Sequence, residues 1–378
     1  VGFSGVLADT GSGPLFIFNG LHTAGTATLN TGQWRYFDGA TLSLDSDAGG
    51  YFRYTAPTDY LALQQDNLAA STAGITGFSW IKNRDAADNH ILQNSVLGIY
   101  NYLESNTSDA LVTETNSVQR FLQQGVQIGN FDEVNTSAES FVLWQWANDG
   151  GAGSVNGDGD TDITLAVNST AGFSYGSAVG PSSGGFTVGH GLGVQPDFAL
   201  IKTTSTQGWA VWHSGLTNET SYYLVLQTNA AEDSSTTIWN NTAPTTSVFS
   251  TSADWFGADK TYPCFFWTAV EGYSSFGSYE GNGDADGPVI YTGFRPAYTL
   301  MKNIDASQNW HVYDTKRSPY NPANKILLPD DTSAEVDNVD RIDILSNGFK
   351  LRTTSSPNSA KTYIYAAFAE NPFGGSGV

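Results

Sequence analysis

The stretch Phe198-Ala199-Leu200-Ile201-Lys202 decides the fold, because its pattern occurs three times in the chain. Apolar runs that end in lysine also stand at 78–82 and at 298–302. Each lysine is followed by a polar turn and then by a second apolar run, and two such runs around a turn are typical of a β-hairpin. The sequence therefore predicts one hairpin in three copies. The lysines expected at equivalent strand ends are Lys82, Lys202 and Lys302.

The three copies also end alike, in apolar runs at 141–146, 262–267 and 363–368. An aromatic residue opens each run and another closes it. Near-continuous apolar character predicts strands that are buried on both faces. Pro263 in the middle run favours an edge strand or a bulge, because proline cannot donate a ladder hydrogen bond. The closing aromatic residues, which we expect in the core, are Trp146, Trp267 and Phe368.

These repeats predict an all-β fold of tandem antiparallel β-sandwich modules, three of them internally homologous. Aromatic residues make up 13% of the chain, and strands need them, while the abundant small polar residues suit turns. We expect a helix content below ~10%. The predicted organisation is an N-terminal β-rich segment at 1–72, a first repeat at 73–152, a connector with a second repeat at 153–272, and a connector with a third repeat at 273–378.

The chain is strongly acidic, with 16 Lys and Arg against 37 Asp and Glu and a net charge of −21. Such a surface repels phosphate backbones and anionic lipid, so no nucleic-acid partner is expected. The longest apolar runs have strand length, short of the ~20 residues of a spanning helix, so no membrane insertion is expected. The single cysteine, Cys264, excludes an intramolecular disulfide and a Cys-based zinc site.

Six motifs stand out along the chain from about residue 50 to its end: Tyr54-Thr55-Ala56-Pro57-Thr58-Asp59-Tyr60-Leu61-Ala62-Leu63, Trp80-Ile81-Lys82-Asn83-Arg84, Val188-Gly189-His190-Gly191-Leu192-Gly193, Gly277-Ser278-Tyr279-Glu280-Gly281-Asn282-Gly283, Gly293-Phe294-Arg295-Pro296 and Ala367-Phe368-Ala369-Glu370-Asn371-Pro372-Phe373. Together they resemble a repeated β domain of unknown function that occurs in tail-fibre and other virion structural proteins of marine tailed bacteriophages.

The resemblance implies a virion location and supplies no catalytic residues. It implies a tail fibre or other appendage that presents a contact surface for a host receptor, a glycan, with other virion proteins as partners. We expect a homo-oligomer, because linked copies of a weak site gain avidity. The resemblance implies a trimer rather than a dimer. The alternatives are a capsid-surface or other non-tail virion protein and a sugar-cleaving tail enzyme.

A candidate calcium loop lies between the first and second repeats. Carboxylate and amide oxygens at alternate positions are the ligands that calcium prefers. The pattern departs from an EF-hand, because Thr161 stands where the turn glycine belongs and no glutamate closes the loop. The other interpretation is a solvated Asp/Gly linker. The candidate calcium ligands are Asn156, Asp158, Asp160 and Asp162.

Three aromatic residues of the middle repeat form a candidate ligand-binding site. Trp239, Trp255 and Phe256 lie in polar, turn-rich stretches that have no counterpart in the other two repeats. Aromatic faces flanked by Asn and Asp are typical of sugar binding. Contacts in a core or between subunits use the same residue types, so that alternative stays open.

No catalytic constellation stands out in the sequence. A glycosidase needs two carboxylates about 5–9 Å apart, and the scattered acidic residues single out no such pair. No nucleophile elbow, phosphate-binding loop or dinucleotide fingerprint occurs in a strand–helix context. Asp314 with Lys316 and Arg317 indicates a surface ion pair or a ligand clamp. We expect that the protein is not an enzyme.

Overall fold

The computed structural model describes residues 43–44, 51–52, 61–64, 75–122, 125–148 and 153–372. Most of the predicted N-terminal segment, residues 1–72, lies outside this part of the chain. Regular structure in the described part is almost all β-strand, and the one helix there is the single turn α1 (Ala253–Phe256). Neighbouring strands pair antiparallel, in stacked sheets. The predicted all-β sandwich class is therefore confirmed.

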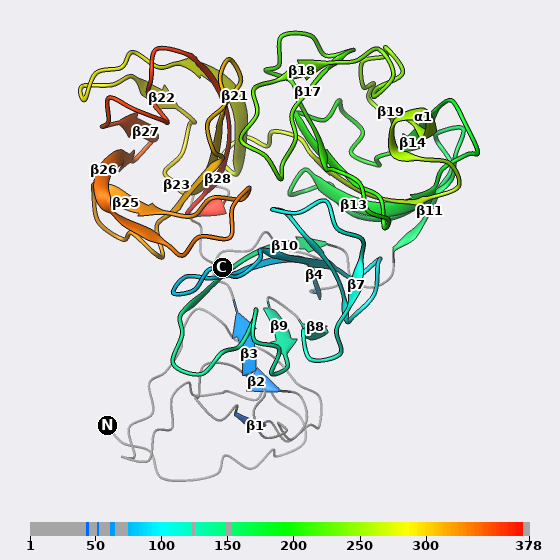
Figure 1. The fold of residues 1–378 in the computed structure, drawn as a ribbon, viewed down its shortest axis with the longest axis horizontal. Coiled ribbons are helices and arrows are strands. Elements are labelled where there is room, and N and C mark those ends of the chain that lie inside the picture. The colour runs from blue at the N-terminus through cyan, green and yellow to red at the C-terminus, as the bar shows by residue number, and fades with distance from the viewer. Residues whose placement is uncertain are drawn as a thin grey trace.

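The strands form three units, which Figure 1 shows around a common centre. The first unit spans residues 61–148, the second 154–267 and the third 274–369. Each unit has an inner sheet, which faces the other two units, and outer strands that cover the far side of the unit. Upstream of them, β1 (Ser43–Leu44) pairs with β2 (Tyr51–Phe52).

In each inner sheet, every strand pairs with the next one named. In the first unit they are β10 (Phe141–Asn148), β4 (Ile75–Asn83), β5 (Ile91–Asn94), β6 (Asn101–Glu104) and β7 (Val112–Thr113). In the second they are β11 (Ser154–Asn156), β12 (Ile163–Asn168), β13 (Phe173–Val179), β20 (Thr261–Trp267), β15 (Phe198–Ile201) and β16 (Ala210–His213). In the third they are β21 (Ser274–Glu280), β28 (Thr362–Ala369), β23 (Pro296–Asn303) and β24 (His311–Asp314).

The outer strands close the far side of each unit. The first unit has β3 (Leu61–Gln64), β9 (Gly125–Ile128) and β8 (Val118–Leu122). The second has the pairs β14 (Gly185–Gly189) with β19 (Val248–Ser252) and β17 (Tyr222–Tyr223) with β18 (Asp233–Ser234). The third has β22 (Val289–Tyr291), β27 (Gly348–Leu351), β26 (Val336–Leu345) and β25 (Ala323–Ile326).

The same three-strand order stands in every inner sheet: β10-β4-β5, β20-β15-β16 and β28-β23-β24. The predicted hairpins are present as β4 with β5, β15 with β16 and β23 with β24. The closing aromatic of each last strand also pairs with the first residue of the quoted hairpin run. These register pairs are Trp146 with Phe78, Trp267 with Phe198 and Phe368 with Tyr298.

Pro263 lies in an interior strand, so the expectation of an edge or a bulge was wrong. β20 pairs with β13 through Pro263 without a register shift, and on its other side it pairs with β15 only as far as Cys264. The Pro263 carbonyl accepts from the amide of Lys202, on the β15 side. In an antiparallel strand the nitrogen of a residue faces the same side as its carbonyl. The N–H that Pro263 lacks would therefore point toward β15, at the end of the ladder between β15 and β20. The sheet loses few hydrogen bonds at that place.

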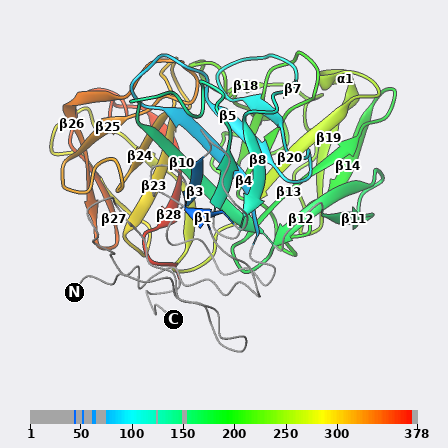
Figure 2. The ribbon, with the colours of Figure 1, turned by 90° about the horizontal axis from the view of Figure 1, so that it is seen from below.

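Alternate residues of the inner strands meet in one shared aromatic core between the three units. Trp146 lies at its middle, with ring centroids 5.9 Å from Trp267 and 5.5 Å from Phe368. All three rings are buried, as predicted. Figure 2 shows the first unit's β4 and β10 between β23 of the third unit and β13 of the second. Burial of large aromatic side chains is the main stabilising term that such a body has available.

The other face of each inner sheet packs on its own outer sheet. Ile81, Ile201 and Met301 occupy the same place in the three hairpins, and each belongs to the separate core of its unit. Successive residues along these strands alternate between this core and the shared one. The inner strands are therefore buried on both faces, which confirms the prediction from their continuous apolar character.

The three hairpin lysines are fully buried, although each lies within one residue of the end of a strand. The ammonium group of Lys202 donates to the backbone carbonyl of Asp109 in the first unit at 2.9 Å. The ammonium group of Lys302 donates to the backbone carbonyl of Asn229 in the second unit at 3.3 Å. Lys82 donates to Ala86 within its own turn at 3.0 Å. Burial lowers the pKa of each lysine to about 8, against the opposing effect of nearby carboxylates.

A second kind of contact between units is made by two tryptophans, one just before β16 and one just before β24. The indole nitrogen of Trp209 donates to the carbonyl of Glu104 in the first unit at 2.8 Å. The indole nitrogen of Trp310 donates to the carbonyl of Val225 in the second unit at 3.3 Å. Each of these two units is thus fastened to the unit before it by a buried tryptophan. The first unit carries His90 just before β5, and its Nδ1 accepts from Trp80.

Candidate functional site

A pocket of ≈ 350 Å³ opens between the first and third units. One wall is β10, and the other is formed by the third unit's inner sheet and by the turn that follows β24. A volume of this size lies in the range of natural ligand sites. The residues that line it are Leu63, Arg84, Phe141, Val142, Leu143, Trp144, Gln145, Trp146, Tyr273, Ala297, Tyr298, Asp314, Thr315, Lys316, Arg317, Phe368, Ala369 and Glu370.

The pocket lies along β10, which is an edge strand in the part of the chain that the structure describes. Within the described residues β10 pairs only with β4, whereas its counterparts β20 and β28 are paired on both sides. In the second unit Phe173 of β13 stands opposite Trp267, and in the third unit Ser274 of β21 stands opposite Phe368. No described strand stands opposite Trp146 on that side. The free edge of β10 therefore offers backbone donors and acceptors to the pocket.

Gln145 on the pocket wall is buried without a partner. Its side chain is 4% exposed, yet neither its amide nitrogen nor its amide oxygen makes a hydrogen bond. An unsatisfied buried polar group costs about 1–3 kcal/mol. The neighbours Trp144 and Trp146 point the other way, into the shared core. A hydrogen-bonding occupant of the pocket would remove this cost.

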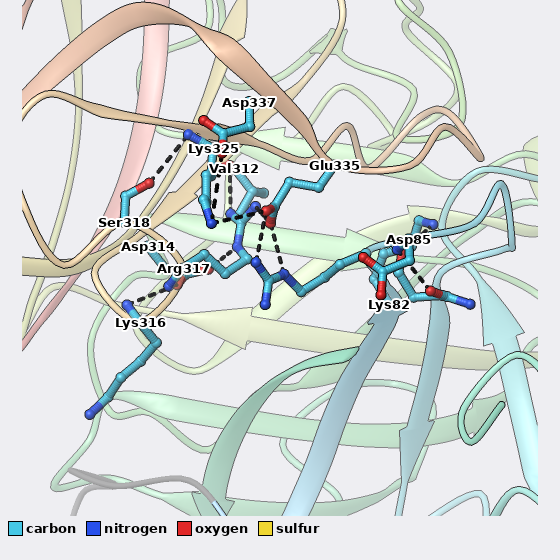
Figure 3. Close-up of polar contacts among 12 residues, drawn as sticks. Lys82, Asp85, Val312, Asp314, Lys316, Arg317, Ser318, Lys325, Glu335 and Asp337 are labelled. Atoms are coloured by element: carbon cyan, nitrogen blue, oxygen red, sulfur yellow. Dashed lines mark hydrogen bonds and ion pairs between the residues drawn. The ribbon is translucent and has the colours of Figure 1, made fainter. Parts of the chain in front are cut away.

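A buried ion-pair network, shown in Figure 3, forms the polar rim of the pocket. Arg84 of the first unit binds Glu335 of the third in a two-point contact, with Nη2–Oε1 at 2.8 Å and Nε–Oε2 at 2.9 Å. Arg317 reaches the same carboxylate at 3.1 Å and binds Asp314 at 2.5 Å. Burial acts to raise the pKa of Glu335, but hydrogen bonds and charge from Arg84 and Arg317 hold it below its usual value.

The network also fixes an aromatic wall. The guanidinium of Arg317 lies 5.6 Å from the centre of the Trp144 ring, and the indole nitrogen of Trp144 donates to Asp314 at 3.1 Å. Asp314 and Arg317 are therefore a buried pair that joins two units, and not the surface pair that was one interpretation of the sequence. The second acid of the wall, Glu370, pairs with Arg295 at 2.7 Å.

The arrangement suits binding better than catalysis. Both acids that line the pocket are held in ion pairs, Asp314 with Arg317 and Glu370 with Arg295, so neither is free to act as one of the two carboxylates that a glycosidase needs. What the wall offers instead is a strand edge, an unpaired amide and several aromatic rings. These groups recognise an extended polar chain by hydrogen bonds and stacking.

Two of the three aromatic residues predicted to bind a sugar lie in the core. Trp239 is 1% exposed, and its indole nitrogen donates to the carbonyl of Tyr222 at 2.8 Å. Phe256 is 4% exposed and packs edge-on against Tyr262. Neither ring has a face open to a ligand, so the sugar-binding interpretation was wrong for these two, and the alternative, a place in the core, holds.

The physical reason is the turn that follows Trp239. Asn240 and Asn241 both adopt the left-handed conformation, with φ of 50° and 48°. Asparagine tolerates this conformation well, so the polar flank forms a tight turn at the surface while the ring turns inward. Trp255 packs on Tyr223 with centroids 5.0 Å apart and stays only partly buried. Sugar binding at Trp255 stays a prediction.

Of the four candidate calcium ligands, Asn156 ends β11, and Asp158, Asp160 and Asp162 follow it in an exposed stretch. Asn156 Oδ1 accepts from the amide of Asp158 at 3.0 Å, and Asp160 Oδ1 accepts from the amide of Thr187 at 2.7 Å. Part of the oxygen set is thus used by the backbone. Across the described ranges, no group of three or more His, Cys, Asp or Glu side chains is arranged to hold a metal ion. Calcium binding by Asn156, Asp158, Asp160 and Asp162 stays a prediction.

Sequence reasoning missed the pocket itself. None of the wall residues of β10 was singled out as a site, because in the sequence they resemble one more buried strand. A signal was present in Gln145, a polar amide inside an otherwise apolar run. The neighbouring units carry Phe266 and Ala367 at the equivalent register position. A single polar replacement in a repeated core strand marks a changed environment.

Comparison with protein families gives one match. The family described as a domain of unknown function, DUF7483, matches residues 52–372. The chain belongs to this family. The DUF7483 domain thus includes all three units and begins within β2. No curated protein and no solved structure matches the chain. Within the described residues of the DUF7483 domain, no helix is long and apolar enough to span a membrane.

Proposed function

We propose that this protein is a structural component of a bacteriophage virion, in a tail fibre or similar appendage, that contacts a glycan on the host surface. The six motifs that resemble virion proteins support a virion location. The all-β fold and the net charge of −21 are compatible with it. The role is mechanical and adhesive, and not enzymatic.

The observation that carries this proposal is the shared core. Trp146, Trp267 and Phe368 come from three different units and meet in one buried cluster. We infer that the units are copies of one module, with the boundaries 73–152, 153–272 and 273–378. A body held by one core and by contacts between successive units resists partial opening, which suits a part under mechanical load. Homo-oligomerisation into a trimer would add copies of the contact surface.

Exposed tyrosines at one end of the third unit are the best candidates for host contact. Tyr291 is 71% exposed and Tyr320 is 84% exposed. Tyr291 pairs with Gly348, and the side chain of Asn321, next to Tyr320, bonds to Ile344. Both therefore lie beside the turn between β26 and β27. Exposed aromatic faces with a polar tip are suited to stacking on sugar rings.

Two alternatives belong to the same proposal. A capsid-surface or other non-tail virion protein would use the same fold. A sugar-cleaving tail enzyme would need a free pair of carboxylates, and the pocket acids Asp314 and Glu370 are both ion-paired. We therefore rank the enzyme last.

Imaging of virions with gold-labelled antibody against this protein tests the proposal. Label on the tail supports it, label on the capsid favours the first alternative, and absence from purified virions overturns it. Incubation of the purified protein with host polysaccharide, followed by a reducing-end assay, tests the enzyme. Release of sugar ends would replace the adhesive role by a catalytic one.

A further inference from the structure

The buried amide of Gln145 has no counterpart in the other two units. On the face of the inner sheet that packs on the outer strands, its register position is held by Phe266 in the second unit and by Ala367 in the third. Both belong to the apolar cores of their own units. Among the described side chains with buried, unpaired polar atoms, Gln145 is the one that leaves two such atoms unpaired. A group able both to donate and to accept thus lies buried without a partner.

The pocket reaches this amide from the interior of the first unit. Phe141, Leu143 and Gln145 lie on one face of β10, because successive side chains of a strand alternate between its two faces. All three line the pocket, and so does Leu63 of the outer strand β3. The pocket therefore extends between the inner and outer strands of the first unit, and the Gln145 amide faces it.

The boundary between the second and third units is closed by comparison. The cavity found there has a volume of ≈ 0 Å³, so it has no room for a water molecule, whereas the pocket beside β10 measures ≈ 350 Å³. The residues around the closed cavity are Phe198, His213, Leu300, Trp310, Ile364, Tyr365 and Ala366. The open space and the unpaired amide thus occur together in the first unit.

The charges around the pocket favour a neutral ligand. The ion pairs of the wall and rim are Arg84 with Glu335, Arg317 with Asp314, and Glu370 with Arg295. The side chain of Lys316 is exposed and points away from this network (Figure 3). A charged ligand would have to compete with these pairs and would lose its hydration on entry. A neutral ligand avoids both costs.

Phe141 supplies an aromatic surface beside the amide. It is half-buried, whereas the other described aromatic residues of the wall are at most 9% exposed. Four residues separate Phe141 from Gln145, which is about 13 Å along a strand. A sugar ring has an apolar face that can stack on an aromatic ring, and its hydroxyl groups both donate and accept hydrogen bonds. A short saccharide lying along β10 can therefore reach both side chains.

We propose that this pocket binds a short neutral saccharide, such as a disaccharide. One ring stacks on Phe141, and the hydroxyl groups of the next ring provide the partners that the Gln145 amide lacks. A volume of ≈ 350 Å³ suits a ligand of this size. The site is separate from the exposed Tyr291 and Tyr320, and it does not rest on the virion role, because the purified protein binds or fails to bind a free saccharide wherever it is located.

Saturation-transfer NMR of the purified full chain tests the proposal with maltose, cellobiose, lactose and chitobiose as probes. We expect saturation of at least one of them, and weaker binding of its counterpart in which one ring is a glucuronic acid. Absence of transfer to every neutral probe overturns the proposal. Tighter binding of the charged counterpart overturns the assignment of a neutral ligand.

Gln145→Leu removes the amide while it keeps the size of the side chain. Binding should weaken roughly tenfold or more, as expected for the loss of hydrogen bonds in a buried site. The matched control is Gln195→Leu, because the Gln195 amide bonds to Glu219 in the second unit, and it should bind as the wild type does. Unchanged binding in Gln145→Leu would place the saccharide elsewhere and overturn the proposal.

Thermal unfolding without sugar separates binding from folding. Gln145→Leu should unfold no earlier than the wild type, because it removes an unpaired buried amide. Earlier unfolding would show that the amide is bonded within the protein, which contradicts the proposal. Phe141→Leu, which removes the ring and keeps an apolar side chain, should also weaken binding. If Gln145→Leu fails to fold, Phe141→Leu decides, and unchanged binding in that variant overturns the site.

Discussion

The guanidinium of Arg84 binds the carboxylate of Glu335 through two hydrogen bonds, although 251 residues separate the two in the chain. The Glu335 side chain is 8% exposed, so this contact joins the first unit to the third in a largely dry setting. Arg317 shares the same carboxylate. Loss of the carboxylate would leave two buried cations short of a partner.

Glu335→Gln should therefore lower the free energy of unfolding by about 3–5 kcal/mol, as expected for a broken buried ion pair. Urea denaturation followed by tryptophan fluorescence measures the change. The matched control is Asp286→Asn, which removes an ion pair to Lys350 from an exposed carboxylate and should leave the stability almost unchanged, because solvent screens the pair. Equal costs for the two variants would show that the network does not hold the units together.

The pH dependence of this pair has a definite sign. The folded-state pKa of Glu335 is held below its usual value, so its stabilisation is present above the unfolded pKa of ~4.3 and is lost as the pH falls through the folded value. The stability difference between wild type and Glu335→Gln should shrink in that acid range. Denaturant midpoints measured from neutral pH downward provide the check, and a difference that stays constant would contradict the assignment.

Lys202 should make the protein more stable as the solution becomes alkaline. Its folded pKa is lowered to about 8 by burial, against ~10.4 for an unfolded lysine. Between these values the unfolded chain binds more protons, so the free energy of unfolding rises with pH. Relative to Lys202→Met, the wild type should gain stability from about pH 8 to about pH 10 in urea titrations. Lys361→Met, which replaces an exposed lysine, is the reference variant. The prediction would be refuted if the free energy of unfolding of the wild type fell relative to that of Lys202→Met over this pH range.

Trp267→Ala should destabilise the protein by about 3–5 kcal/mol, because it opens a cavity in the shared core. The ring is 3% exposed and packs against Trp146 and Phe173. Thermal or urea unfolding measures the loss. Tyr320→Ala, at a ring that is 84% exposed, is the control and should change stability by no more than about 0.5 kcal/mol.

The adhesive role predicts a separate effect of the exposed tyrosines. Particles assembled with Tyr291→Ala and Tyr320→Ala should adsorb more slowly to the host, because stacking on sugar rings is lost while the fold is kept. The control Val179→Ala removes an exposed apolar side chain from the second unit. Trp255→Ala tests the remaining aromatic of the middle repeat. If adsorption is normal in correctly assembled particles of every variant, the contact surface lies elsewhere.

The local strand pattern could be predicted from the sequence because its information is local. Alternation with a period of two, polar turns and recurring aromatic positions place Phe78, Phe198 and Tyr298 at equivalent register positions without any knowledge of the tertiary fold. The burial of Trp146, Trp267 and Phe368 follows from the same pattern. Residues that pair along one strand or across one turn need no distant partner to define them.

Tertiary structure alone decided the rest, because it depends on partners far along the chain. The sequence leaves open which side of each inner sheet joins the shared core, and it gives no sign that Arg84 meets Glu335. Trp239 looked exposed because its neighbours are polar, yet the turn at Asn240 and Asn241 sends the ring inward. Gln145 shows the limit most clearly. Its strand resembles β20 and β28 in sequence, and only the three-dimensional arrangement reveals that, among the described residues, β10 is paired along one edge alone.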